Sequence, residues 1–274
     1  MARQGGVDQR LRSRVASGLD RARLLPAAER VREALLARRG RGGPEADENG
    51  LPLPPPRLRL LVDGRNADAG YFLAIGRQMA ASIAAAAADS GVPLDGAGSI
   101  LDFGCGCGRV ARHWAELDGP EVHGCDYNPE LVEWCQGNLP FLRASRNELE
   151  PPAPYPDASF DVVYALSVLS HLSEPLQDAW VADFRRILRP GGLLIVSVLG
   201  DAARGRLTRA EEKRFDRGEL VVERPRMSGR NACTAYHPRA YVTERLLRDF
   251  AEVKPFDLGG GVLTMLQDGY AARR

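Results

Sequence analysis

The sequence predicts an α/β fold in which an open, mostly parallel sheet is flanked by helices and ends in an antiparallel last strand. From residue 98 onward, short apolar runs alternate with amphipathic stretches of helical spacing. This alternation is typical of parallel strands joined by helices. With 274 residues, of which 44% are apolar, the chain is long enough for one large domain and an appendage.

The segment before the alternating region has its own composition. Residues 1–40 carry ten arginines against four acidic residues, with Val7, Leu11, Val15 and Leu19 at helical spacing. They predict a basic helical extension that packs on the main domain or on a second subunit, so a homodimer through these helices is one arrangement. A basic arm that touches an acidic partner or nucleic acid is the alternative. Residues 41–57 are rich in Gly and Pro and predict a linker, and residues 58–97 a helical preface.

The main domain is expected to span residues 98–274. Its first four strands are predicted at 99–103, 121–125, 160–166 and 193–199, and its helices at 109–117, 129–137 and 175–188. Residues 201–236 contain many arginines and no clear period, which indicates an insertion. After an amphipathic stretch at 241–250, the final two strands are predicted at 253–258 and 262–271. Ligands of such sheets bind at the carboxyl ends of the strands.

Charge and cysteine content exclude several classes of protein. The formal net charge of +1 argues against nucleic-acid binding by the whole domain. No apolar run reaches the roughly 18 residues that span a membrane. Five cysteines are scattered without a secretory leader, which indicates reducing cytoplasm. Cys105 and Cys107 lack the further ligands that zinc requires, so no metal is expected.

The most informative segment is ILDFGCGCGRV at residues 100–110. An apolar strand ends at Asp102, and a turn follows with Gly104, Gly106 and Gly108 before a predicted helix. Glycine lets the backbone turn sharply and lets a ligand approach closely. The spacing is G-x-G-x-G, unlike the G-x-G-x-x-G of dinucleotide sites, because Arg109 follows the third glycine. The G-K-[ST] of nucleoside-triphosphate loops is also missing.

This D-x-G-x-G-x-G turn resembles the cofactor turn of class I S-adenosylmethionine-dependent methyltransferases, and three further motifs extend the resemblance. Asp126 and Tyr127 directly follow the second predicted strand, DASFDVVYALSVLSHL covers residues 157–172, and LRPGGL covers residues 188–193. The resemblance spans about residues 98–200 and implies a Rossmann-like sheet with S-adenosyl-L-methionine as cofactor.

The resemblance also implies roles for single residues. Asp126 is expected to bind the ribose hydroxyls, Tyr127 to pack on the adenine, Asp102 to reach the methionine end and Asn147 to meet the adenine amino group. Alternatively, Asp126 only caps the following helix, Asp102 only supports the turn, and Asn147 is a loop residue. The expected cofactor-binding set consists of Asp102, Gly104, Cys105, Gly106, Gly108, Arg109, Asp126, Tyr127, Asn147 and Leu166.

The implied chemistry is in-line attack of an acceptor on the sulfonium methyl group. His171, just past the strand at 160–166, is a candidate general base, and His237 is a second. For either histidine, the alternative is a structural hydrogen bond to a neighbouring segment.

Motifs that are missing narrow the acceptor. The sequence lacks the N-P-P-Y motif of exocyclic-amine methylases and the Pro-Cys pair of cytosine methylases. It therefore favours an enzyme that methylates an O or N nucleophile of a small molecule. Arginines in the insertion suit an anionic acceptor, although a solvated charged loop explains them as well. Two other classes stay open: a nicotinamide-dependent oxidoreductase, and a catalytically silent cofactor-binding protein that works by interaction.

Overall fold

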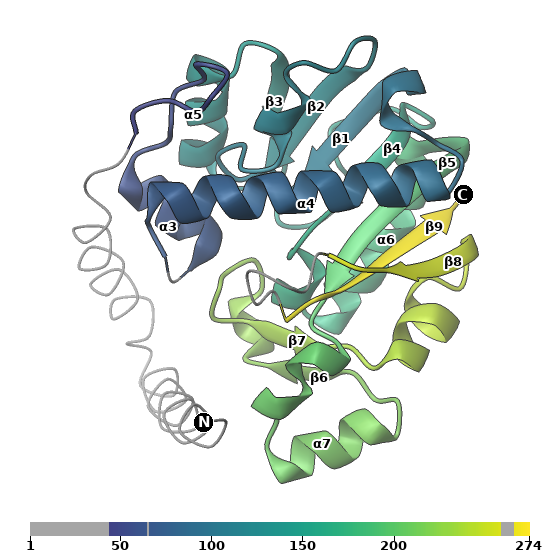
Figure 1. The fold of residues 1–274 in the computed structure, drawn as a ribbon. Helices are drawn as coiled ribbons and strands as arrows, with labels where there is room; N and C mark the ends of the chain where they lie inside the picture. Colours follow the sequence, from purple (N-terminus) through teal and green to yellow (C-terminus); the bar gives the residue numbers. More distant parts are fainter. Residues whose placement is uncertain (1–43, 65, 259–265) are drawn as a thin grey trace.

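A seven-stranded sheet forms the centre of the computed structural model, which describes residues 44–64, 66–258 and 266–274 (Figure 1). The strands are β1 (Ser99–Phe103), β2 (Glu121–Asp126), β3 (Leu142–Arg146), β4 (Phe160–Ala165), β5 (Leu188–Val198), β8 (Ala251–Phe256) and β9 (Asp268–Arg273). Their order is β3-β2-β1-β4-β5-β9-β8. The first five are parallel, and β9 runs antiparallel to both β5 and β8. The predicted fold class is confirmed.

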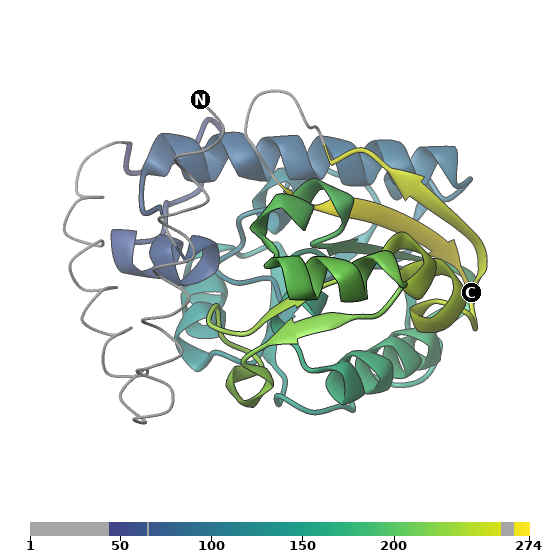
Figure 2. The same cartoon turned by 90° about the horizontal axis from the view of Figure 1, so that it is seen from below.

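Helices cover both faces of the sheet because alternate strand residues point in opposite directions. In β1, Ile100 packs in the cluster that contains α4 (Ala69–Asp89) and α5 (Pro129–Asn138). The next residue, Leu101, packs with α6 (Glu174–Ile187) and η6 (Tyr241–Leu246). The view in Figure 2 sets α4 and α6 on opposite sides of the sheet. The fold therefore has three layers, and the two helical layers leave the carboxyl ends of the strands open.

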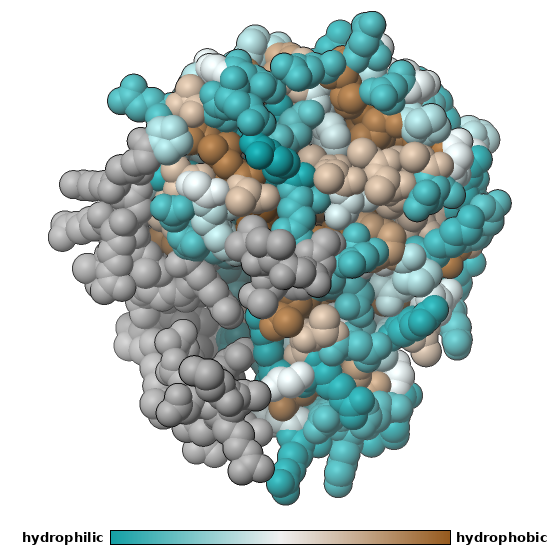
Figure 3. Space-filling model, in the orientation of Figure 1, coloured by the Kyte–Doolittle hydropathy of each residue, from teal (hydrophilic) through white to brown (hydrophobic). Residues whose placement is uncertain are grey.

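The long helix α4 begins at an Asp68 cap whose side chain accepts from the backbone nitrogen of Tyr71. Its inner face is apolar, whereas several of its outward positions are alanines. In Figure 3 the pale brown surface above the centre follows this helix. Alanine has the highest helix propensity, so this sequence favours a straight 21-residue helix.

Two predicted elements differ in the structure, and one strand has no counterpart in the prediction. The helix predicted at 109–117 is wrong: only a short 3-10 helix, η2 (Ala111–Trp114), forms there. Gly108 still has a left-handed φ of +72°. The turn therefore extends to the position at which the α-helix was predicted to begin. Strand β3 was not predicted, because Leu-Arg-Ala-Ser-Arg has too weak an apolar run. The last strand begins at Asp268 rather than 262, and residues 262–265 lie outside the described ranges.

The predicted basic helices at 1–40, and any homodimer through them, lie outside the described residues. Part of the predicted linker is described, and it lies against the core. The side chain of Arg112 is fully buried and pairs with Asp47 at 2.8 Å. Its guanidinium also donates to the carbonyl of Pro52 at 3.1 Å. This buried pair fixes the segment before α3 (Pro56–Asp63) beside the turn that follows β1.

The predicted insertion folds as a small layer beyond β5. Its elements are η4 (Asp201–Arg206), α7 (Arg209–Asp216), β6 (Val221–Glu223), η5 (Pro225–Met227) and β7 (Thr234–Tyr236). Strands β6 and β7 pair antiparallel as a separate sheet. Across the part of the chain that the structure describes, no helix has the length and hydropathy needed to cross a membrane.

Candidate functional site

The loop after β1 reverses direction through its glycines. Gly104 and Gly106 have φ values of +76° and +55°, which side chains with a Cβ rarely adopt. A Cβ at Gly104 would lie 2.5 Å from Cγ2 of Val168, and one at Gly106 would lie 2.6 Å from Cγ2 of Val62. Glycine is thus required for both dihedral angle and space, and the bare backbone of the turn borders a cavity.

Asp126, the last residue of β2, faces this turn across the parallel β1–β2 pair. Its carboxylate accepts from the backbone nitrogens of Gly106 at 3.0 Å and Asn128 at 2.8 Å. Burial raises the pKa of this carboxyl, while the two N–H donors favour its charged form. A carboxylate has about four acceptor positions, so it has capacity left for a ligand diol.

Asn147, just past β3, continues the same edge of the sheet. Its backbone nitrogen donates to the carbonyl of Asp126 at 3.2 Å, and its Nδ2 donates to the carbonyl of Glu148 at 2.6 Å. Its Oδ1 is buried and finds no hydrogen-bond partner among the described residues. Because buried acceptors are rarely left unpaired, this oxygen fits an amino group brought by a ligand.

Tyr127 lies beside Asp126 and is 40% exposed. Its hydroxyl donates to the carbonyl of Gly229, which belongs to the insertion. The ring therefore forms one wall of the cavity and also joins the end of β2 to the insertion.

His171 lies in η3 (Leu169–His171), directly after β4. Its Nδ1 lies 2.8 Å from the carbonyl oxygen of Cys233. A carbonyl can only accept, so Nδ1 carries the proton and Nε2 of the neutral ring keeps a lone pair. Burial lowers the pKa of His171. The ring is therefore a neutral, oriented imidazole, and Nε2 has no partner within the described ranges.

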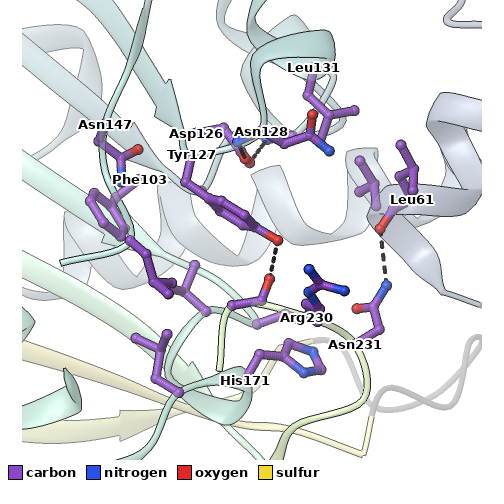
Figure 4. A pocket seen from close by; sticks show the side chains of 18 of the residues that line it. Leu61, Phe103, Asp126, Tyr127, Asn128, Leu131, Asn147, His171, Arg230 and Asn231 are labelled. Carbon is purple, nitrogen blue, oxygen red and sulfur yellow. Dashed lines mark hydrogen bonds between the residues drawn. The ribbon is translucent and has the colours of Figure 1, made fainter. Parts of the chain in front are cut away.

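These groups surround one cavity of about 340 Å³ (Figure 4), a volume within the range of small-ligand sites. The predicted site residues that line it are Gly104, Gly106, Arg109, Asp126, Tyr127, Asn147, Leu166 and His171. Figure 4 shows Asp126 and Asn147 at one end and His171 at the other, with Tyr127 between them.

Asp102, Cys105 and Gly108 are not among the residues that line the cavity. Asp102 is buried, and the nearby hydroxyl of Tyr164 and backbone of Ala111 oppose the effect of burial on its pKa. Burial raises its pKa to about 7. This position agrees with the alternative in which Asp102 supports the turn.

His237 is also separated from the cavity. It is fully buried, and its Nε2 lies 2.9 Å from Oε1 of Gln177, inside the fold. Burial lowers its pKa to about 3. His237 was predicted as a second candidate base. The structure corrects this prediction, because the ring is fully buried and does not line the cavity.

Arg109 lines the cavity at the glycine turn and lies close to α3. Its guanidinium is 3.7 Å from the carboxylate of Asp63, and both side chains are mostly buried. Arg109 therefore faces an acid of α3, and its buried Nε has no partner among the described residues.

Sequence reasoning missed the residues that close the cavity. They come from α3 and its C-cap, from α6 and from the insertion: Leu61, Val62, Gly64, Trp180, Gly229 and Asn231. Arg230, one of the insertion arginines that the sequence suggested for an anionic acceptor, lines the cavity beside them. Nδ2 of Asn231 donates to the carbonyl of Leu61 at 3.1 Å, which joins the insertion to α3 above the glycine turn (Figure 4). Residues 56–63 carry no motif, and only the arginine content of residues 201–236 pointed to the insertion.

The strand order, the glycine turn and the acid at the end of β2 define an α/β enzyme domain that binds a nucleoside-containing cofactor. Residues 100–192 match a family model described as a methyltransferase domain. This part of the chain is therefore similar to the methyltransferase domains that use S-adenosyl-L-methionine.

Three curated relatives have names that indicate methyl transfer to an oxygen atom. The 27-O-demethylrifamycin SV methyltransferase of Amycolatopsis mediterranei is 36% identical over 121 residues, which are 40% of each chain. Malonyl-[acyl-carrier protein] O-methyltransferase of Serratia marcescens is 30% identical over 60% of this chain and 65% of that protein. Ubiquinone biosynthesis O-methyltransferase of Cereibacter sphaeroides is 32% identical over 39% and 43%. The chain therefore spans less than two thirds of each of these relatives.

A solved structure agrees on the fold. The 1,6-didemethyltoxoflavin-N1-methyltransferase of Burkholderia thailandensis, with bound 1,6-didemethyltoxoflavin and S-adenosylhomocysteine, has a TM-score of 0.52 and 21% identity. The match covers 81% of this chain and 92% of that one. At this identity the likeness establishes the architecture alone.

Proposed function

We propose that this protein transfers a methyl group from S-adenosyl-L-methionine to an O or N nucleophile of a small-molecule acceptor. The observation that carries the proposal is the pairing of Asp126 and Asn147 along one cavity wall. The Asp126 carboxylate, fixed by two backbone N–H groups, fits a ribose diol. The buried amide oxygen of Asn147, which has no partner among the described residues, fits an adenine amino group. The relatives named as O-methyltransferases support oxygen as the acceptor atom.

The residues present fit this cofactor along the whole wall. Asp126 would accept hydrogen bonds from the ribose hydroxyls, and Tyr127 would pack against the base. The turn through Gly104 and Gly106 would border the rest of the cofactor, with the unused Nε of Arg109 as a donor on that side. When bound, S-adenosyl-L-methionine supplies an electrophilic methyl group on a sulfonium.

His171 is the proposed base for an acceptor that must lose a proton. Its Nδ1 donates a hydrogen bond to the Cys233 carbonyl. Nε2 is therefore the atom that takes the proton of a hydroxyl or ammonium. Such a base contributes about 10²- to 10⁴-fold to a rate. The apolar side chains of Leu166, Val168 and Leu172 beside it would limit access of water.

Binding measurements test the proposal and separate it from its alternatives. Wild-type protein is titrated with S-adenosylhomocysteine, NAD and NADP by calorimetry, and we expect binding of S-adenosylhomocysteine only. Asp126→Ala should weaken that binding by about 10- to 100-fold, because charged hydrogen bonds are lost. Glu133→Gln, an exposed acid on α5, is the control and should change nothing. A variant Asp126→Ala that binds like wild type contradicts the site.

Transfer itself needs a second readout. Candidate metabolites are incubated with methyl-labelled cofactor and analysed by mass spectrometry for labelled product. Binding of S-adenosylhomocysteine without any labelled product favours the silent interaction protein instead. A cytoplasmic location is part of the proposal, and it is supported by five free cysteine thiols, all buried.

A further inference from the structure

Four of the eight arginines in the insertion pair with acidic residues of the insertion itself. Arg204 pairs with Glu212 and Asp216. Arg214 and Arg217 share Glu219, and Arg224 pairs with Glu223; the distances are 3.0, 2.7 and 3.1 Å. Two of these pairs join η4 to α7, and all of them engage guanidinium groups that would otherwise be available to a ligand. The number of arginines in the sequence therefore overstates how much of the insertion can bind an anion.

Arg230 differs from these arginines. It lines the cavity, and no acidic partner for its guanidinium is found in the described residues. Figure 4 shows the guanidinium between Tyr127 and His171. The other arginine of the lining, Arg109, is on the side of the glycine turn and already faces Asp63. Arg230 is therefore the cation that stands at the His171 end of the cavity.

The segment that carries Arg230 is fixed on three sides. The nitrogen of Gly229 donates to the carbonyl of His171 at 2.8 Å, and its carbonyl accepts from Tyr127. The next side chain, Asn231, donates to Leu61 of α3. A cation on so constrained a backbone loses less entropy on binding than one on a free loop.

From this placement we propose that Arg230 recognises an acidic group, a carboxylate or a phosphate, on the methyl acceptor. The inference rests on the proposed function and specifies its substrate class. A guanidinium binds either group through two parallel N–H donors. The acceptor is then one small molecule that carries both the acid and the hydroxyl or amine to be methylated. The acid lies against Arg230, and the nucleophile points toward Nε2 of His171.

Matched pairs of probes test this assignment by calorimetry in the presence of saturating S-adenosylhomocysteine. One pair is salicylate and salicylamide, and the other is phenyl phosphate and phenol, so the two pairs distinguish carboxylate from phosphate recognition. Wild-type protein should bind the acid of at least one pair about 10- to 100-fold more tightly than its neutral partner. Arg230→Gln should reduce that ratio to about 1 and leave the affinity for S-adenosylhomocysteine unchanged.

The control is Arg226→Gln, since Arg226 is exposed in the same insertion and does not line the cavity; it should keep the wild-type ratio. Circular dichroism checks that both variants fold. Equal binding within both pairs, or no binding of any probe, overturns the assignment. A tenfold loss of S-adenosylhomocysteine affinity in Arg230→Gln also overturns it, because the residue would then serve the cofactor. Wild-type protein that binds no S-adenosylhomocysteine contradicts the proposed function itself.

Discussion

The two ends of the cavity are built in different ways. At the cofactor end, Gly106 and Asp126 are 20 residues apart and meet because β1 and β2 are parallel neighbours. At the other end, His171 and Cys233 are 62 residues apart and meet through one hydrogen bond between the ring Nδ1 and a carbonyl oxygen. The first end is a product of local sequence and strand pairing, whereas the second exists only after the whole chain has folded. Cofactor binding and acceptor recognition should therefore respond separately to mutation.

The largest expected effect is that of His171→Gln. If the two ends work separately, this change should lower turnover of an identified acceptor by about 10²- to 10⁴-fold, with S-adenosylhomocysteine affinity within twofold of wild type. Labelled-methyl transfer and calorimetry measure the two quantities. A parallel loss of cofactor affinity and turnover would show that the two ends of the cavity do not respond separately to mutation.

The same residue gives a prediction for pH. Burial lowers the pKa of His171 below its usual 6.5, and only the neutral ring can accept a proton. NMR titration of the ring should therefore show protonation below pH 6.5, and wild-type turnover should fall only below that pH. A titration midpoint above 6.5 would contradict this.

The sequence predicted the cofactor end better than the acceptor end, because the cofactor end is built from local motifs and strand pairing. Asp126, Tyr127 and the glycines lie within motifs, and parallel strand order alone brings them together. His171 was found because it follows β4, whereas His237 was misplaced because residue type and position in the chain do not reveal burial. Neither the α3 residues Leu61 and Val62 nor the contact of Tyr127 with the insertion has a local signal. Tertiary packing decides these contacts.

A third prediction concerns Asp102, the buried acid at the end of the β1 motif. Burial raises the pKa of Asp102 from 3.8 to about 7. The protonated form is thus favoured in the folded state, and the stability it contributes is complete below pH 3.8 and is lost as pH rises through about 7. In Asp102→Asn, the difference in unfolding free energy between pH 4 and pH 8 should shrink by about 2–4 kcal/mol, at 1.36 kcal/mol per pKa unit.

Urea denaturation at the two pH values measures this difference. Asp95→Asn, at an exposed acid, is the control and should keep the wild-type difference. An unchanged pH dependence in Asp102→Asn would mean that the buried carboxyl is not the source.

The smallest expected effect tests the hydrogen bond that closes the cavity. Asn231→Ala removes the bond to the carbonyl of Leu61, which is worth about 0.5–1.5 kcal/mol. We expect S-adenosylhomocysteine to dissociate about 2- to 10-fold faster, with little change in thermal stability. Stopped-flow fluorescence measures the rate, and Asn49→Ala, at an exposed position, is the control. An unchanged dissociation rate would show that this contact does not hold the cavity closed.

The buried pair of Arg112 and Asp47 has a consequence for where the folding unit begins. A fragment that starts at β1 would keep every motif and the whole of residues 100–192 that match the family. It would lose Asp47 and the carbonyl of Pro52, two of the groups that hold the guanidinium of Arg112, and would expose that side chain to water. The motifs mark where the cofactor binds, whereas the contacts that pack behind the glycine turn begin some fifty residues earlier, at Asp47.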